Sequence, residues 1–516
     1  MSVKLKNASG VSPLHQVGQS REDSATVAAP KARMRLAKGN GRSAAALGPQ
    51  SQSTSSPKGA KDGEVLALGE IVQPRRWKAS PGDHPDLHYI GLEHIEAHTT
   101  RLLGSVPATE MRSTANRFQS GDVLYSRLRP YLNKVWRADR EGLCSSEFIV
   151  LPGNDRVDSA YLRYRLNAHD FVSFANSLNA GDRPWVDFDQ IATFKTWLPC
   201  SLPEQRRIVA EIEKQFTRLE AGVAALRRVQ ANLKRYRAAV LKAACEGRLV
   251  PTEAELAKTG NRKARFESGE TLLARILTER RKNWKGRGQY KEPVEPDTAN
   301  FPTLPDGWAW ASAEQLCLTV ASGSTPSADQ LFQRDGEVPF IKVYNLTFGG
   351  PLDFSVKPTF ISKVMHEGRL GRSKAFPGDV LTNIVGPPLG KVSIVPDRFP
   401  EWNINQAIVV FRPTEAISNR LLAFWLRSEG VLARLDHTAK ATAGQFNIQV
   451  TTCRKLALPV PPMAEQTRIT AEVERRMSVV DELEVVVSAN LKRAIRLRES
   501  ILQKAFTGQL LLKGDA

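Results

Sequence analysis

The sequence predicts a mixed α/β fold in which two tandem globular domains are each followed by a long helix. Strand-like runs divided by Gly and Pro fill two segments, about 65–199 and 308–461. After each segment comes a stretch of roughly forty residues without proline, in which apolar residues recur at spacings of three and four. A shift of 261 residues places the first stretch on the second without a gap. We therefore expect a duplicated unit of domain and helix.

The segment 1–64 is predicted to be a disordered basic tail. It is rich in Ser, Ala, Gly, Lys and Arg and nearly lacks aromatic residues. Such a composition cannot bury enough apolar surface to offset the conformational entropy that is lost on ordering.

The first mixed α/β domain is predicted over 65–199. It contains the strand-like runs VLALGEIV, LHYIGLEHI, GDVLYSRL and SSEFIVLPG. The run AYLRYRLNAHDFVSFANSL, which lies among them, has a helical pattern.

A first long helix is predicted over 200–249. It opens with Pro203–Arg207, and Gly247 marks its end. The apolar positions of its packing face are Ile208, Ile212, Phe216, Leu219, Val223, Leu226, Leu233, Tyr236, Val240 and Ala244. At a rise of about 1.5 Å per residue, the helix would be about 60 Å long.

The remaining segments complete the predicted duplication. Residues 250–307 are charged and punctuated by proline, which predicts a linker with one short helix at ETLLARILTERRKNW. The second α/β domain, over 308–461, has the strand-like runs PFIKVYNL, GDVLTNIV, KVSIVP and NQAIVVFRP. Residues 462–516 are expected to form the second long helix and the C-terminus.

The repeat is strongest in the helices. EQRRIVAEIE falls on EQTRITAEVE, and nine of the ten packing positions of the first helix stay apolar in the second. Because each helix can bury its apolar face against the other, we expect an antiparallel coiled coil with pseudo-two-fold symmetry. The domains repeat more weakly, as in Gly121–Leu124 and Gly378–Leu381.

Composition restricts the possible partners. The chain has 73 Lys and Arg against 54 Asp and Glu, a formal charge of +19, which favours a polyanionic partner, nucleic acid first. Its five scattered cysteines form no CxxC pair, so neither structural zinc nor a disulfide framework is expected. No apolar run approaches ~18 residues, and the N-terminus lacks the apolar stretch of a secretory signal. A cytoplasmic protein without a membrane partner is the expectation.

The catalytic motifs are incomplete. Gly386–Val392 is one residue short of a nucleotide-binding loop, so we interpret it as a turn between strands. Asp182–Trp185 has three of the four positions of an adenine methyltransferase motif, and no lysine has a carboxylate two residues before it, as many nucleases require. His84, His88, His94 and His98 have spacings that suggest zinc, but exposed or DNA-facing histidines are favoured. We expect no catalytic residue, no metal and no cofactor in this chain.

Nucleic-acid contacts are predicted where basic residues alternate with aromatic or small polar residues near strand ends. The densest such stretch is Tyr125–Lys134, and a second candidate is the loop before the last strand of each domain, 181–185 and 444–447. The candidate residues are Arg127, Arg129, Lys134, Arg183, Trp185, Asn383, Lys391, Gln445 and Asn447. A solvated hairpin and ordinary turn residues are the alternative interpretations.

This order of parts resembles the specificity subunits of type I restriction-modification systems. The resemblance covers about 65–512 and depends most on the paired openings Pro203–Ile208 and Pro462–Ile469 and on the endings KAACEGRL and QKAFTGQL. It implies that the two domains are target recognition domains, each of which reads one half of a bipartite, asymmetric DNA site. The tail 1–64 departs from the family, either as an added DNA-binding arm or as an over-extended start with Met34 as the alternative beginning.

The same resemblance implies the partners. The helices would act as a ruler and as a docking surface for two methyltransferase (modification) subunits that use S-adenosylmethionine. Restriction subunits would supply translocation and cleavage that depend on ATP and Mg, and the chain itself would be non-catalytic. Two alternatives stay open, namely a degenerate fused restriction or modification enzyme and a non-specific DNA-binding coiled-coil scaffold.

Overall fold

The computed structural model describes residues 63–178, 183–259, 266–286, 288–299, 301–334, 336–386, 388–440 and 447–511. All of them belong to one compact unit, Ser55–Ala516. The predicted tail 1–64 lies outside the described residues except for its last two positions.

The first α/β region runs from β1 to β10 and is built from small sheets. Its strands are β1 (Gly63–Ala67), β2 (Lys78–Ala79), β3 (His88–Ile90), β4 (Val106–Pro107), β5 (Ala115–Phe118), β6 (Val123–Ser126), β7 (Val135–Arg137), β8 (Gly142–Cys144), β9 (Phe148–Leu151) and β10 (Lys195–Pro199). Its helices are α1 (Leu68–Ile71), α2 (Ser159–Asn167), α3 (His169–Ser177) and α4 (Phe188–Ala192). The sheets have the orders β2-β5-β8-β3-β4, β7-β6-β9 and β1-β10.

The second α/β region runs from β11 to β20. Its strands are β11 (Ala309–Ser312), β12 (Cys317–Ser322), β13 (Val338–Ile341), β14 (Phe360–Ile361), β15 (Lys374–Ala375), β16 (Val380–Asn383), β17 (Val392–Ile394), β18 (Trp402–Ile404), β19 (Ile408–Pro413) and β20 (Ala457–Val460). Its helices are α8 (Ala313–Leu316), α9 (Lys363–Glu367), α10 (Asn419–Arg427), α11 (Glu429–Lys440) and α12 (Val450–Arg454).

The two regions share a strand topology. β6 lies antiparallel between β7 and β9, as β16 lies between β17 and β19. β3 pairs parallel with β8, as β13 pairs with β18, and the outer strands β1 and β10 pair like β11 and β20. The weak sequence repeat of the domains therefore corresponds to a repeated arrangement of strands.

The central strands β6 and β16 are buried along their whole length, on both faces. In β6, Leu124 packs against Phe118 and Trp136, whereas Val123 and Tyr125 pack on the side of α2 and α3. Successive side chains of a strand point to opposite faces, so a strand between two layers reads as a continuous apolar run. This explains why GDVLYSRL is strand-like without alternating.

The repeated Gly-Asp before these strands is structural. Gly121 and Gly378 have φ of 90° and 88°, a left-handed conformation that favours glycine. The buried carboxylate of Asp122 accepts a hydrogen bond from the main-chain N–H of Gln119 and pairs with Arg75 at 2.9 Å. Asp379 makes the matching bonds to the N–H of Phe376 and to Arg412.

Two long helices connect to the regions. They are α5 (Leu202–Cys245) and α13 (Met463–Phe506), each of 44 residues. Between α5 and β11 lie α6 (Glu253–Thr259) and α7 (Gly269–Lys282), of which α7 packs into the core of the second region through Leu272 and Ile276. The segment predicted as a linker thus contains two helices.

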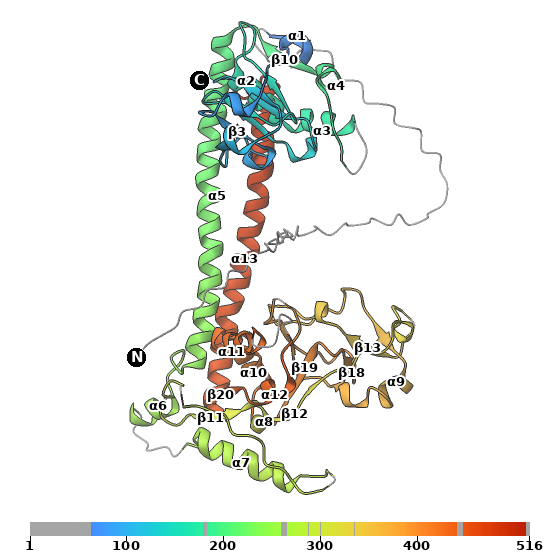
Figure 1. Cartoon of the computed structure of the whole chain (residues 1–516). Helices are drawn as coiled ribbons and strands as arrows, with labels where there is room; N and C mark the ends of the chain where they lie inside the picture. The colour runs from blue at the N-terminus through green and yellow to red at the C-terminus, as the bar shows by residue number, and fades with distance from the viewer. Residues whose placement is uncertain are drawn as a thin grey trace, which may run out of the picture. The chain divides into compact units, whose positions relative to one another are not determined.

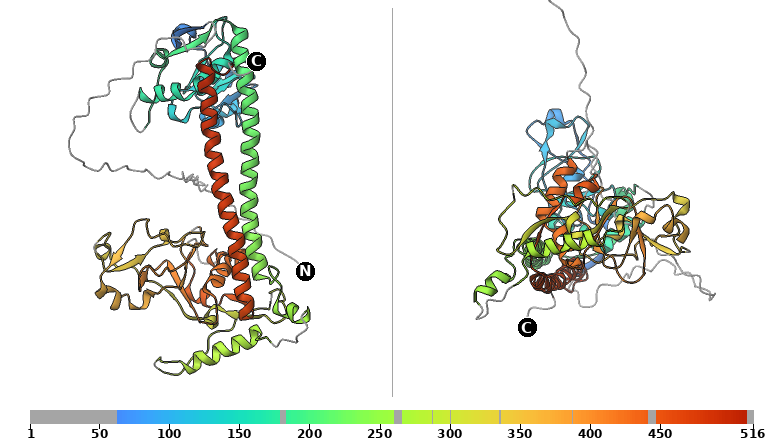
Figure 2. Two further views of the ribbon diagram at one scale, coloured as in Figure 1. Left: turned by 180° about the vertical axis from the view of Figure 1, so that it is seen from behind. Right: turned by 90° about the horizontal axis from the view of Figure 1, so that it is seen from below.

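The long helices lie antiparallel, as Figures 1 and 2 show. The first turns of α5, from Ile208 to Phe216, share a buried cluster with Ile501–Phe506 at the end of α13. The last turns of α5, from Val240 to Ala244, share another with Ile469 and Val473 at the start of α13. Leu233, Val480 and Val487 fill the contact between these ends.

The packing face of α5 is narrower than predicted. Tyr236 is 44% exposed, and Leu497 at the corresponding position of α13 is 48% exposed. A pair of helices buries only the stripe that faces the partner, and residues at the edge of that stripe stay in solvent. The inclusion of Tyr236 in the buried face was therefore wrong.

The paired helix openings have a physical explanation. Gln205 is fully buried, and its side-chain amide donates to the carbonyls of Arg156 and Pro199 and accepts from the N–H of Asp158. Gln466 repeats this set with Ala416, Pro461 and Ser418. The glutamine of the repeated EQ motif thus fastens each long helix to the α/β region that precedes it.

Candidate nucleic-acid interface

In the first region, the stretch Tyr125–Lys134 lies beside 183–185, the described part of the second candidate segment. Leu128, just after β6, forms a bridge with Trp185. The N–H of Val186 donates to the carbonyl of Arg127 at 3.0 Å, and the N–H of Arg129 donates to the carbonyl of Pro184 at 2.8 Å. Tertiary structure thereby joins the stretch Tyr125–Lys134 to the loop before β10.

A cation–aromatic pair forms the centre of this surface. The guanidinium of Arg127 lies over the Trp185 ring, 3.9 Å from its centroid, and Trp185 is 39% exposed. Among the described residues, the buried Nε of Arg127 has no hydrogen-bond partner. Arg129 and Arg183 are exposed beside the pair. Three arginines and an indole are thus gathered where base stacking and phosphate contact are both chemically possible.

The turn that carries Arg129 has a tightly specified backbone. Arg129 and Asn133 flank the 3-10 turn Pro130–Leu132 and have φ of 53° and 47°. Asn133 is fastened to Asn167 by two side-chain hydrogen bonds of 3.0 Å. His98, itself at φ 61°, donates its N–H to the carbonyls of Leu132 and Asn133.

The side chains of two predicted lysines bind main-chain carbonyls of their own regions. The Nζ of Lys134 donates to the carbonyl of Leu92 at 2.6 Å, and the Nζ of Lys391 donates to that of Val343 at 3.4 Å. Leu92 and Val343 begin 3-10 turns that follow β3 and β13. Burial lowers the pKa of Lys134, and the charge of Glu93 opposes this shift. In this geometry both amines hold a loop of the region in place.

The second region repeats the turn with other side chains. Val385, after β16, forms a bridge with the exposed Asn447, and the N–H of Ile448 donates to the carbonyl of Ile384. The described residues between Asn383 and Val392 connect the antiparallel strands β16 and β17, in agreement with the predicted turn between strands. The prediction for Gln445 falls outside the described residues.

Asn383 has an internal role in this turn. It is 2% exposed, its Nδ2 donates to the carbonyl of Pro388, and its Oδ1 accepts from the N–H of Lys391. Both ends of its amide are therefore used by the turn. Of the two predicted asparagines of the second region, Asn447 is therefore the one with an exposed side chain.

Sequence reasoning missed several exposed aromatic side chains. In the first region Tyr131 is 42% exposed at the tip of the strained turn. In the second region Phe348 is 52% exposed with the Nζ of Lys391 5.9 Å from its ring, and Tyr344 lies 6.0 Å from that of Lys357. An aromatic residue beside paired glycines, as in Phe348-Gly349-Gly350, is the signal that could have found one of them.

The structure gives no support for a zinc site at the four spaced histidines. In the described part of the chain, the ligand atoms close enough to share an ion belong instead to His366, Glu367 and Glu401. The ammonium of Lys374 already pairs with both carboxylates, and Asn403 donates to Nδ1 of His366, which leaves Nε2 to donate to Glu401. The hydrogen bond from His366 lowers the pKa of Glu401. This cluster is a compensated polar network.

The comparisons with known proteins agree with the fold. A model of the type I restriction modification DNA specificity domain matches residues 305–483, which include the second region and the first half of α13. The Escherichia coli EcoDI specificity subunit is 31% identical over 142 residues, which are 27% of this chain and 31% of that protein. The E. coli EcoBI specificity subunit is 25% identical over 315 residues, 60% of this chain and 57% of that protein.

The matches thus relate residues 305–483 to the type I restriction modification DNA specificity domain and make the chain similar to specificity subunits of type I restriction enzymes. The chain spans between about a third and three fifths of the length of these curated relatives. It is also similar in fold to a chain from a study of complex assembly and conformational transition of the type I R-M system. That match has a TM-score of 0.61 and 21% identity and covers 87% of this chain and 99% of the other.

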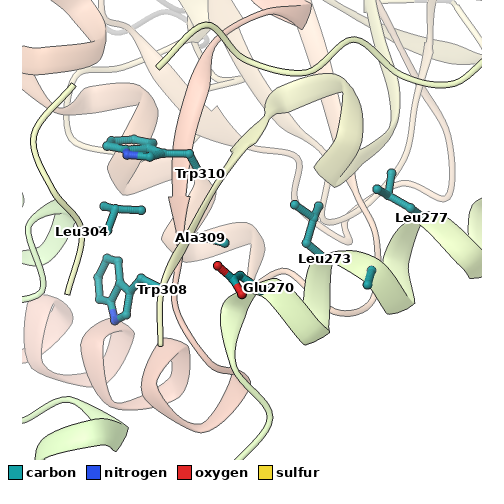
Figure 3. Close-up of a pocket in the computed structure, with 8 residues that line it drawn as sticks. Glu270, Leu273, Leu277, Leu304, Trp308, Ala309 and Trp310 are labelled. Atoms are coloured by element: carbon teal, nitrogen blue, oxygen red, sulfur yellow. The ribbon is translucent and has the colours of Figure 1, made fainter. Parts of the chain in front are cut away.

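The structure also has hollows lined by residues other than those of the basic surface. One of them, of about 530 Å³, lies between α7 and Leu304–Trp310. Figure 3 shows its lining, which includes Glu270, Leu273 and Leu277 of α7 and the indoles of Trp308 and Trp310. Its lining is mainly apolar, unlike the cationic surface at Arg127. Among the helices in the described residues, none has the length and apolarity that crossing a membrane requires.

Proposed function

We propose that this chain is a type I restriction-modification specificity subunit, which reads a bipartite, asymmetric DNA site and directs partner subunits to it. The observation that carries the proposal is the repeated turn after β6 and β16, which in each region meets the segment before the last strand. In the first region this junction exposes arginines and an indole, and in the second it exposes Asn447. Arg and Asn side chains form bidentate pairs with guanine and adenine, respectively.

The two α/β regions would act as tandem target recognition domains. Their strand topology repeats, whereas the side chains at the turn differ, with Arg127 in one and Ile384 in the other. Equivalent scaffolds with different surface residues would read different half-sites. The target would therefore be non-palindromic.

The helices would form the antiparallel coiled coil that separates the recognition domains. Each has 44 residues, so at about 1.5 Å per residue it spans about 66 Å. Gln205 and Gln466 fasten each helix to the region before it. A pseudo-two-fold axis that relates the two helices would therefore also relate the two domains. Two domains related in this way would face the duplex with opposite polarity.

The outer faces of the helices would hold the modification subunits. A groove of about 540 Å³ runs between α5 and α13 and is lined by Leu219, Val223, Leu226, Leu497 and Ile501 among others. Val485, Val486 and Ile495 add exposed apolar surface on α13. Apolar surface that is exposed in one chain is typical of a protein interface.

Catalysis would belong to the partners. Two modification subunits would use S-adenosylmethionine to methylate adenine, and restriction subunits would use ATP and Mg for translocation and cleavage. The chain would hold no cofactor, metal or catalytic residue of its own, and would act in the cytoplasm. A degenerate fused enzyme would instead crosslink a methyl donor as the isolated chain, and a non-specific scaffold would bind competitor DNA as well as any target.

The test is to map methylated bases genome-wide in the native cell with and without this gene. We expect loss of one split, asymmetric methylation motif. Replacing residues 65–199 by the corresponding domain of another family member should then change one half of the motif only. A change in both halves would contradict the division of labour between the regions.

A further inference from the structure

The turns after β6 and β16 occupy equivalent positions but carry different residues. The segments 127–133 and 384–390 have the same length. Each begins where a strand residue, Ser126 or Asn383, donates its N–H to the carbonyl of the equivalent lysine, Lys134 or Lys391. The two turns can therefore be compared residue by residue, with Arg129 on Gly386 and Asn133 on Gly390.

Both turns need a left-handed backbone at the same two positions. Gly386 and Gly390 have φ of 81° and 92°, and Arg129 and Asn133 have φ of 53° and 47°. Glycine adopts this conformation freely, whereas an L side chain brings its Cβ close to the backbone. The second region therefore meets the requirement with glycines, and the first region meets it with two residues that are strained there.

Side-chain hydrogen bonds within the chain explain why Asn133 occupies a strained position, but they do not explain it for Arg129. Asparagine tolerates the left-handed region, and Asn133 is buried in its hydrogen bonds with Asn167. The Arg129 side chain is exposed, and within the described residues no hydrogen bond or ion pair of its guanidinium is found. A residue with a strained backbone, whose side chain makes no stabilising contact within the chain, points to a contact with another molecule.

The backbone holds Arg129 in a fixed position. Its N–H donates to the carbonyl of Pro184, its own carbonyl accepts from Leu132, and Pro130 follows it. In the sequence, Arg129 lies two residues after Arg127, whose guanidinium stacks on Trp185, and two residues before the exposed Tyr131. A contact to phosphate can be made by a long cationic side chain from many positions, but a contact to one base edge requires a fixed origin.

We propose that Arg129 reads a guanine in the half-site of the first region. This inference rests on the proposed function, and it assigns one part of the DNA sequence preference of the chain to a single residue. The guanidinium fork donates to the O6 and N7 acceptors of guanine in the major groove. Gly386 offers no side chain at the equivalent position, so the second half-site has no counterpart to this contact.

The test compares full-length wild type with Arg129→Gly and Arg129→Lys. The motif is first defined by methylome mapping in the native cell, and duplexes with each base pair of that motif substituted are then used as binding probes. We expect Arg129→Gly to reduce the preference for guanine at one position of one half-site by about 5- to 150-fold and to leave the other half unchanged. Arg129→Lys keeps the charge but loses the fork, so it should lose most of the same preference.

Stability separates this role from a structural one. Because glycine occupies the equivalent position in the second region, Arg129→Gly should unfold at a temperature no lower than the wild type. Arg228→Ala, exposed on α5, is the matched control and should change no base preference. A variant with a lower unfolding temperature would mean that Arg129 serves the fold, and the inference would be overturned.

The outcomes also separate the inference from the proposed function. If deletion of the gene removes no methylation motif, the proposed function itself fails. If the motif is found but Arg129→Gly keeps every base preference, the reading of guanine is wrong. Equal loss of affinity on all sequences, with a weaker dependence on salt, would identify a phosphate contact and would also overturn it.

Discussion

Replacement of Gln205 by alanine should destabilise the chain strongly, because its buried side-chain amide fastens the start of α5 to the first region by three hydrogen bonds. Gln205 is fully buried and makes three hydrogen bonds, two as donor to the carbonyls of Arg156 and Pro199 and one as acceptor from Asp158. At about 1 kcal/mol for each buried hydrogen bond, the loss is about 3 kcal/mol. The cavity left by the removed side chain adds to this loss.

The assay is urea unfolding of the full chain followed by circular dichroism, with Gln503→Ala as control. Gln503 lies exposed on α13, so its removal should change the free energy of unfolding by less than about 0.5 kcal/mol. Gln205→Glu sharpens the test, since a carboxylate keeps the acceptor for Asp158 but cannot donate to either carbonyl. Equal midpoints for Gln205→Ala and Gln503→Ala would refute the assignment of the EQ motif to this junction.

Three further predictions concern backbone, packing and charge. Gly386→Ala should lower stability by about 1 kcal/mol in thermal unfolding, because φ is 81° there although no atom lies within 4 Å of the added Cβ; an unchanged midpoint would contradict the requirement for a left-handed residue. Val480→Ala, 1% exposed between the long helices, should cost about 1–3 kcal/mol, and Val485→Ala, 69% exposed on the same helix, less than about 0.5 kcal/mol; equal losses would argue against the observed pairing of α5 and α13. Burial raises the pKa of Glu465 above its ordinary 4.5, so the folded state is favoured most when this carboxyl is protonated. As pH rises through and above 4.5, the free energy of unfolding of the wild type should therefore fall relative to that of Glu465→Gln. Parallel pH curves for the two proteins would disprove this.

The repeated turn explains how one scaffold carries two specificities. The hydrogen bonds that shape it come from the main chain and from residues behind it, such as Lys134, Lys391 and Asn383. The exposed side chains at the junction, among them those of Arg129 and Asn447, are not needed for those bonds. A scaffold built in this way can change its surface residues without loss of the turn.

Several features of the site could be predicted from the sequence because they are local. The strand-like run after Gly121, the turn after β16 and the basic stretch around Arg127 each depend on neighbours in the chain. The stack of Arg127 on Trp185 could not be predicted, since it joins residues from separate segments. The hydrogen bond from Lys134 to the carbonyl of Leu92 could not be predicted either, because Leu92 lies in a distant segment of the chain, after β3.

The amino-acid sequence by itself determined the repeat, the mixed α/β composition of the two regions and the two long amphipathic helices. These depend on periodicity, on turn residues and on the register of one half against the other, all of which are properties of the linear chain. Only the tertiary structure decided which equivalent residues are buried and which are exposed. Tyr236 lies at the edge of the helix contact, Asn383 inside its turn and Arg129 outside the equivalent turn, because burial is fixed by packing between distant segments and not by residue type.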